Sequence, residues 1–191
     1  MIKTGDHYCS PEFIEFENNQ IIHFDLEKKT ETKLSKKVNK WNEKLTESKY
    51  EFVNDNRIRI FRMGKTHTVI SETKTTTINT EFATDYERIK PTKTELTTKE
   101  INKLEFKAEW NGENFPIIFN KNLDSKTIKE INKRLKKEGQ KLLLENLQGT
   151  YFVSVYNNGE RKSLIGIKEV DEKKMILFGF PETPYEIKAE L

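Results

Sequence analysis

Apolar and polar residues alternate one by one along much of this chain, and the clearest instance of the pattern occurs twice. Residues 14–24 and residues 50–60 follow the same order. Each segment begins with an apolar residue and Glu-Phe, continues through a polar centre that contains asparagine, and returns through isoleucine. A period of two places the apolar side chains on one face of a β-strand. Asn18-Asn19-Gln20 and Asn54-Asp55-Asn56 are typical of three-residue hairpin loops. The pattern therefore predicts two β-hairpins.

The loop length also predicts the register of each hairpin, because opposite side chains share a face of the sheet. The expected cross-strand pairs are Ile14 with Phe24, Phe16 with Ile22, Tyr50 with Ile60 and Phe52 with Ile58. These pairs give each hairpin one apolar face and one mostly polar face, as expected of a half-buried sheet.

A third hairpin is expected around Asn111-Gly112, because Asn-Gly is the leading signature of a two-residue type I′ turn. Its expected pairs are Ala108 with Phe115 and Phe106 with Ile117. Pro116 falls on the other face and predicts an edge strand or a bulge. The expected inner face of the three hairpins comprises Ile14, Phe16, Phe52, Ile58, Phe106 and Ile117.

More strands are expected towards the C-terminus. Residues 151–167 predict a fourth hairpin that turns at Asn157-Asn158-Gly159. Met175–Phe180 is apolar on both faces, which predicts a central strand, and residues 185–191 alternate in a last strand.

Residues 66–94 are rich in threonine and have two interpretations. The first is a pair of strands, because β-branched threonine suits the solvated face of a sheet. On one such strand Thr76, Ile78, Thr80 and Phe82 share a face, and Thr75, Thr77, Asn79 and Glu81 share the other. The second interpretation is a low-complexity linker, but Phe82 and Tyr86 favour strands.

One amphipathic helix is expected at residues 126–138, where Ile128, Ile131 and Leu135 form an apolar stripe. Thr127 and Glu130 fit a capping box there. Thr97-x-x-Glu100 repeats that start signal and predicts a single helical turn.

These elements together predict a mainly β fold, a β-rich α+β arrangement. An antiparallel meander would form a barrel or a strongly curved sheet, with the helix near residues 126–138. We expect a single domain over residues 1–191. Pro91 and the polar run that follows indicate a sub-boundary at 91–100, between a β-meander at 12–90 and a hairpin, helix and strand unit at 101–191.

The composition agrees with a sheet that is exposed to solvent on one face. The hydrophobic fraction of 34% is low and the charged fraction of 34% is high, but the 12 Phe fall in patterned segments, which argues against disorder. The 34 basic and 31 acidic residues nearly balance, so nucleic-acid binding is not expected. No apolar run is long enough for a membrane span.

The single cysteine, Cys9, excludes an internal disulfide and favours a cytoplasmic location. A periplasmic or secreted location is the alternative if a signal segment has been removed.

The sequence contains no catalytic or metal-binding constellation that we recognise, and it predicts no cofactor. His7, His23 and His67 lie at no metal-ligand spacing from one another or from Cys9. His23 is expected on a polar strand face as a solvated imidazole. The acidic residues alternate with apolar ones, which indicates a wet sheet face.

The best polar candidates for binding are Arg57, Arg59 and Arg62, which one strand would present. Arginines on a strand can bind an acidic partner, a carboxylate or phosphates. The competing interpretation is that they pair with glutamates on neighbouring strands. Trp41 and Trp110 are the aromatic candidates, either for lining a pocket or anchoring an interface or, alternatively, as core residues.

The many antiparallel strands, the tryptophan at position 41 and the alternating faces resemble lipocalin-like (calycin) barrels. Gly149-x-Tyr151 is similar to the glycine-x-tryptophan start of that superfamily, which adds Tyr151 to the candidate residues. Lipocalins place their tryptophan motif on the first strand, whereas Trp41 follows a whole hairpin here and lacks the glycine. The resemblance implies a barrel whose mouth binds a small apolar ligand, or a barrel used for protein contacts.

The first functional expectation is therefore a non-enzymatic protein that holds a small apolar ligand in or at the mouth of a β-barrel. The alternative is a protein–protein interaction module, such as an inhibitor or immunity protein that neutralises a toxin or an enzyme. An enzyme without a recognisable motif is the third.

Overall fold

The computed structural model describes residues 2–3, 13–37, 41–71, 74–110, 113–119, 140–157, 159–178 and 187–190. These residues form a mainly β, antiparallel fold, as predicted. They divide into two compact units. The helix expected at 126–138 lies outside the described residues.

The first unit contains a seven-stranded sheet, in the order β6-β3-β2-β1-β9-β8-β7. Its strands are β1 (Ile2–Lys3), β2 (Phe13–Glu17), β3 (Gln20–Phe24), β6 (Trp41–Lys44), β7 (Lys49–Asn54), β8 (Arg57–Ser71) and β9 (Lys74–Glu87). A short 3₁₀ turn, η1 (Leu45–Glu47), precedes β7. The core of this unit consists of Ile14, Ile21, Ile58, Ile60 and Tyr86.

The second unit contains another seven-stranded sheet, in the order β11-β10-β16-β15-β14-β13-β12. Its strands are β10 (Glu105–Trp110), β11 (Glu113–Ile118), β12 (Gln140–Leu147), β13 (Thr150–Asn157), β14 (Glu160–Val170), β15 (Lys174–Leu177) and β16 (Ile187–Glu190). A two-stranded hairpin of β4 (Leu26–Lys28) and β5 (Leu34–Lys36) belongs to the same unit. An isolated bridge pairs Phe119 with Leu142, and so brings residues at the two ends of the strand order together.

Residues from most of these strands form one core cluster in the second unit. Its buried members include Phe106, Ile117, Leu144, Val153, Ile167 and Met175. The predicted single helical turn is present as α1 (Thr98–Ile101), with Thr97 and Glu100 in a complete capping box. Ile101 anchors this turn in the core cluster.

The predicted registers of the second and third hairpins are confirmed. Tyr50 pairs with Ile60 and Phe52 with Ile58, across a bulge that follows Phe52. Phe106 pairs with Ile117 and Ala108 with Phe115, and Pro116 lies on the edge strand β11 as expected. The fourth hairpin forms from β13 and β14, and Met175 lies on an internal strand, β15.

The register of the first hairpin was wrong by one residue. Asn18 and Asn19 both adopt left-handed backbone angles, with φ of 47° and 62°. Two such residues make a two-residue turn, because asparagine tolerates this conformation. Glu17 therefore pairs with Gln20, and Phe16 with Ile21 in place of Ile22.

Two other expectations about the inner face were also wrong. Phe16 and Phe52 are 38% and 69% exposed, although Ile14, Ile58, Phe106 and Ile117 are buried as expected. Phe52 is exposed because β7 is the last strand of its sheet and nothing described lies beyond it. His23 is only 1% exposed, because β3 is an internal strand and the ring of Trp41 stacks on the imidazole.

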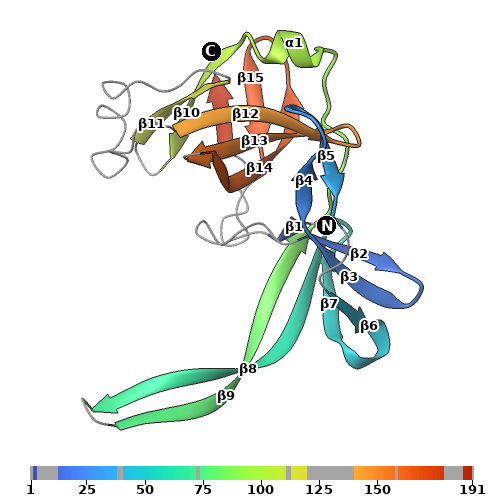
Figure 1. The fold of residues 1–191 in the computed structure, drawn as a ribbon, viewed down its shortest axis with the longest axis vertical. Coiled ribbons are helices and arrows are strands. Elements are labelled where there is room, and N and C mark those ends of the chain that lie inside the picture. The colour runs from blue at the N-terminus through green and yellow to red at the C-terminus, as the bar shows by residue number, and fades with distance from the viewer. Residues whose placement is uncertain are drawn as a thin grey trace. The chain divides into compact units, whose positions relative to one another are not determined.

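The threonine-rich segment forms strands, as predicted. β8 and β9 pair from Arg57 with Glu87 to Ser71 with Lys74. Figure 1 shows both strands continuing as a two-stranded ribbon beyond the ends of β6 and β7. Within the described part of the chain, no helix is long and apolar enough to cross a membrane.

Candidate interaction surface

The arginines Arg57 and Arg59 form a ladder of ion pairs across β8 and β9. Arg57 Nη2 lies 3.2 Å from Glu87 Oε2, and Arg59 Nε donates to Asp85 Oδ1 at 2.8 Å. The hydrogen bond to Asp85 raises the pKa of the Arg59 guanidinium above its usual range. Both pairs join residues that are directly opposite in the register. The binding role of these arginines stays a prediction.

Arg62 and Trp41 are two predicted site residues that the structure brings together. The guanidinium of Arg62 lies 5.2 Å from the centre of the Trp41 ring, and its Nη2 is 3.5 Å from Glu43 Oε2. Trp41 also stacks on His23, with ring centroids 3.4 Å apart. Trp41 is 44% exposed, so this group presents an indole held in place by an imidazole and a cation.

The two remaining predicted residues belong to the second unit. Trp110 ends β10, where it pairs with Glu113. Tyr151 lies on β13 and is half-buried, and its hydroxyl is 2.9 Å from Thr98 Oγ1. This hydrogen bond ties α1 to the sheet, which gives Tyr151 a structural role whether or not it also binds a ligand.

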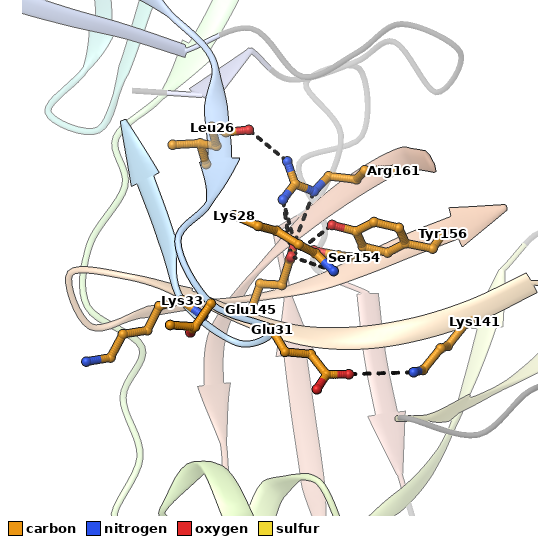
Figure 2. Close-up of polar contacts among 10 residues, drawn as sticks. Leu26, Lys28, Glu31, Lys33, Lys141, Glu145, Ser154, Tyr156 and Arg161 are labelled. Atoms are coloured by element: carbon orange, nitrogen blue, oxygen red, sulfur yellow. Dashed lines mark hydrogen bonds and ion pairs between the residues drawn. The ribbon is translucent and has the colours of Figure 1, made fainter. Parts of the chain in front are cut away.

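The densest polar cluster in the second unit surrounds Glu145 on β12 (Figure 2). The Glu145 carboxylate is fully buried and accepts from Ser154 Oγ at 2.5 Å and from Tyr156 Oη at 2.9 Å. Arg161 donates to it through Nε at 3.0 Å and Nη2 at 3.1 Å. A buried carboxylate needs partners of this kind, because an unpaired charge is costly to bury.

This cluster attaches the β4–β5 hairpin to the large sheet. Arg161 Nη1 donates to the carbonyl oxygen of Leu26 at 3.0 Å, and Lys28 Nζ lies 3.9 Å from Glu145 Oε1. Figure 2 shows the guanidinium of Arg161 between Leu26 and Glu145. Burial, together with the hydrogen bond to Glu145, raises the pKa of Tyr156 to about 12. Ser154 is fully buried, so the arrangement supports the fold and offers no accessible nucleophile.

Reasoning from the sequence missed this cluster, and also missed β4, β5 and β12. β12 was missed because Leu142-Leu143-Leu144 is a continuous apolar run without alternation. One signal was available, because a glutamate directly after three leucines in a strand is buried only when it is paired. Its partner Arg161 is 16 residues away, and only the pairing of β13 with β14 brings it near.

The most unusual surface of the first unit is the outer part of the β8–β9 hairpin. We call residues 63–71 and 74–82 the distal ribbon. Among the described residues, β7 pairs only with positions 57–61 of β8, and β1 pairs only with Tyr86 and Glu87 of β9. The distal ribbon is therefore two strands wide, an arrangement that is marginally stable alone in water.

Between positions 64–68 of β8 and 76–82 of β9, one side of the distal ribbon carries no charged residue, and Arg62 borders it opposite Phe82. The register places Gly64, Thr66, Thr68, Thr76, Ile78, Thr80 and Phe82 on this side, which we call the uncharged face. Ile78 and Phe82 are 51% and 47% exposed. On the same side of the two strands, Arg62 and Thr84 lie between this face and the buried residues Ile58, Ile60 and Tyr86.

The opposite side of the distal ribbon is polar and charged. It presents Met63, Lys65, His67, Asn79 and Glu81, and the Glu81 carboxylate pairs with Lys49 at 2.9 Å. The two sides therefore differ as the inner and outer faces of a sheet differ, although both are open to solvent. Among the described residues, no three His, Cys, Asp or Glu side chains come close enough together to hold a metal ion.

Comparison with known proteins found no matching family model, no similar curated protein and no similar solved structure. The resemblance to lipocalin-like barrels therefore stays an expectation.

Proposed function

We propose that this chain is a protein-interaction module and that its partner covers the uncharged face of the distal ribbon. The observation that carries the proposal is the exposure of Ile78 and Phe82 on the uncharged face, in a part of β8 and β9 that pairs with no other described strand. Contiguous exposed apolar residues on a folded protein mark interaction sites. The proposal involves no catalysis, and an inhibitor or immunity protein is one form of such a module.

A partner would supply the third strand or packed layer that the distal ribbon lacks. A two-stranded ribbon gains stability when a third strand or a packed layer covers it. Its threonine, isoleucine and phenylalanine side chains are those that suit a partly buried strand face. Covering the uncharged face buries no charged residue of positions 64–68 and 76–82, because the charged residues among them, Lys65 and Glu81, lie on the other side.

The test places a photoreactive amino acid at Ile78 or at Asn79 of the full chain in its native cell. These neighbours are both exposed, and they point to opposite sides of the ribbon. We expect a covalent protein adduct from position 78 and little from position 79. Equal adducts from both positions, or none from either, would overturn the proposal.

A second candidate function is the one expected first from the sequence, a barrel that holds a small apolar ligand. The bridge between Phe119 and Leu142 supports it, because a contact between the two ends of a strand order is what closure into a barrel requires. The side chains of the core cluster occupy the space inside such a barrel, so the ligand would bind at its mouth. Native mass spectrometry of the purified protein tests this, and a spectrum without any bound small molecule counts against it.

A further inference from the structure

We infer that His23 is a proton-controlled switch within the first unit, in which a proton on its Nε2 atom exchanges Arg62 for Glu43 as the hydrogen-bond partner. The inference goes beyond the proposed function and does not depend on it. It rests on side chains from three strands, β3, β6 and β8, that meet at one nitrogen atom.

Three polar atoms form a tight triangle at this point. Arg62 Nη2 lies 3.3 Å from His23 Nε2 and 3.5 Å from Glu43 Oε2, and the last two atoms are 3.4 Å apart. His23 is only 1% exposed, and its ring stacks on Trp41. A change in the protonation of the imidazole must therefore be answered by the side chains around it, because water has little access.

The surroundings of the imidazole within the described part of the first unit bring one cation and one anion to it. The anion is Glu43 from β6, and the cation is Arg62 from β8. From β9, the hydroxyl of Tyr86 accepts from Arg62 Nη1 at 3.4 Å. From β2, Ile14 lies directly opposite His23 and adds no charge. The two charges at Nε2 therefore favour opposite protonation states of the ring.

In the neutral state, Arg62 serves both acceptors of the triangle. Its guanidinium is always charged and its Nη2 atom carries two hydrogens, so one N–H points to His23 Nε2 and the other to Glu43 Oε2. Ser48 Oγ donates to the second oxygen of Glu43 at 2.6 Å, so this carboxylate has two donors without a proton from His23. The network thus places the single imidazole hydrogen on Nδ1.

A second proton on the ring reverses this arrangement. Nε2 then carries a hydrogen, can no longer accept from Arg62, and donates to Glu43 Oε2 instead. The side chain of Arg62 is 29% exposed, so its guanidinium has a path to solvent away from the new positive charge. The contact between β3 and β8 through this pair is therefore closed when His23 is neutral and open when it is charged. Histidine is the side chain whose charge ordinarily changes between about pH 5 and 8.

Nitrogen NMR of the ¹⁵N-labelled full chain reads the switch directly, because the chemical shift of an imidazole nitrogen reports whether it carries a hydrogen. We expect His23 to carry its hydrogen on Nδ1 at about pH 8 and on both nitrogens at about pH 5. His23→Gln identifies the signals. A hydrogen on Nε2 at about pH 8 overturns the inference, because His23 would then already donate to Glu43. A ring that stays neutral down to about pH 5 overturns it as well.

Two variants test the exchange of partners. Arg62→Met keeps the apolar stem and removes the cation, so it should raise the midpoint of the His23 titration by about 1 pH unit. It should also move the hydrogen of the neutral ring from Nδ1 to Nε2, because Glu43 then has no competing donor. Glu43→Gln should lower the midpoint by about 1 pH unit, because the anion that favours the charged ring is gone.

His67 is the internal control in the same spectra. It lies on β8, is exposed and contacts Thr77 through Nδ1, so neither variant should move its midpoint. Midpoints of His23 that do not move, or that move in the same direction in both variants, overturn the inference. If Arg62→Met does not fold by far-UV circular dichroism, Glu43→Gln decides alone, and an unchanged or raised midpoint there overturns the inference.

Discussion

The region around Glu145 and the distal ribbon place polar and apolar side chains in opposite ways. At Glu145 a carboxylate is fully buried within a β-sheet and is saturated by Arg161, Tyr156 and Ser154. In the distal ribbon, Ile78 and Phe82 remain half exposed, although the strands suit burial. The first region is complete within its own unit, because the buried carboxylate accepts hydrogen bonds from three different side chains. The second has an apolar face that no described residue covers.

The largest expected effect tests whether the Glu145 region depends on its ion pair. Glu145→Leu leaves the guanidinium of Arg161 mostly buried without its carboxylate. We expect the free energy of unfolding, measured by urea titration with far-UV circular dichroism, to fall by about 3–5 kcal/mol. The double variant Glu145→Leu/Arg161→Leu should recover most of this loss, since no charge is left unpaired. Equal instability of the single and double variants would show that the Glu145 region does not depend on this ion pair.

The second prediction substitutes the same residue type in a core and in the ribbon. Ile167→Ala removes a fully buried side chain from the core cluster, and we expect a loss of about 3 kcal/mol. Ile78→Ala removes an exposed side chain and should change the free energy of unfolding by less than about 0.5 kcal/mol. The measurement is urea unfolding at low protein concentration. A large loss at Ile78 under these conditions would contradict the exposure of this side chain.

The third prediction concerns alkaline pH. Because the pKa of Tyr156 is raised from 10.0 to about 12 in the folded chain, the unfolded chain releases this proton first. The contribution of the group to stability is therefore complete below pH 10 and is lost as the pH rises towards 12. Tyr156→Phe should show a smaller fall in the free energy of unfolding between pH 9 and pH 11 than the unsubstituted chain. Equal falls in the two proteins would remove Tyr156 as the cause.

The smallest expected effect sharpens the description of the uncharged face. Gly64→Ala forces the ring of Phe82 to move, and we expect a loss of roughly 1 kcal/mol. In a Phe82→Ala background the same substitution should be close to neutral, because the obstructing ring is gone. A double-mutant cycle in urea measures this coupling. Additive effects would show that Phe82 does not cover Gly64.

Much of the β-structure could be predicted from the sequence. The hairpin registers at Phe52 and Phe106 follow from alternation and turn chemistry, which act over a few residues. The two faces of β9, with Ile78 and Phe82 on one side, also follow from the period of two. The first hairpin failed because Asn18-Asn19 supports a two-residue turn as readily as a three-residue one.

The burial of each strand face, in contrast, was decided only by the tertiary structure. Phe52 and Ile58 are paired and share a face, but the edge position of β7 leaves Phe52 exposed while Ile58 is buried. His23 is buried because Trp41 stacks on it, and Glu145 is buried because Arg161 reaches it from β14. Alternation determines which side chains share a face, since it is a property of the strand itself. Which face is covered depends on neighbours that are distant in the sequence.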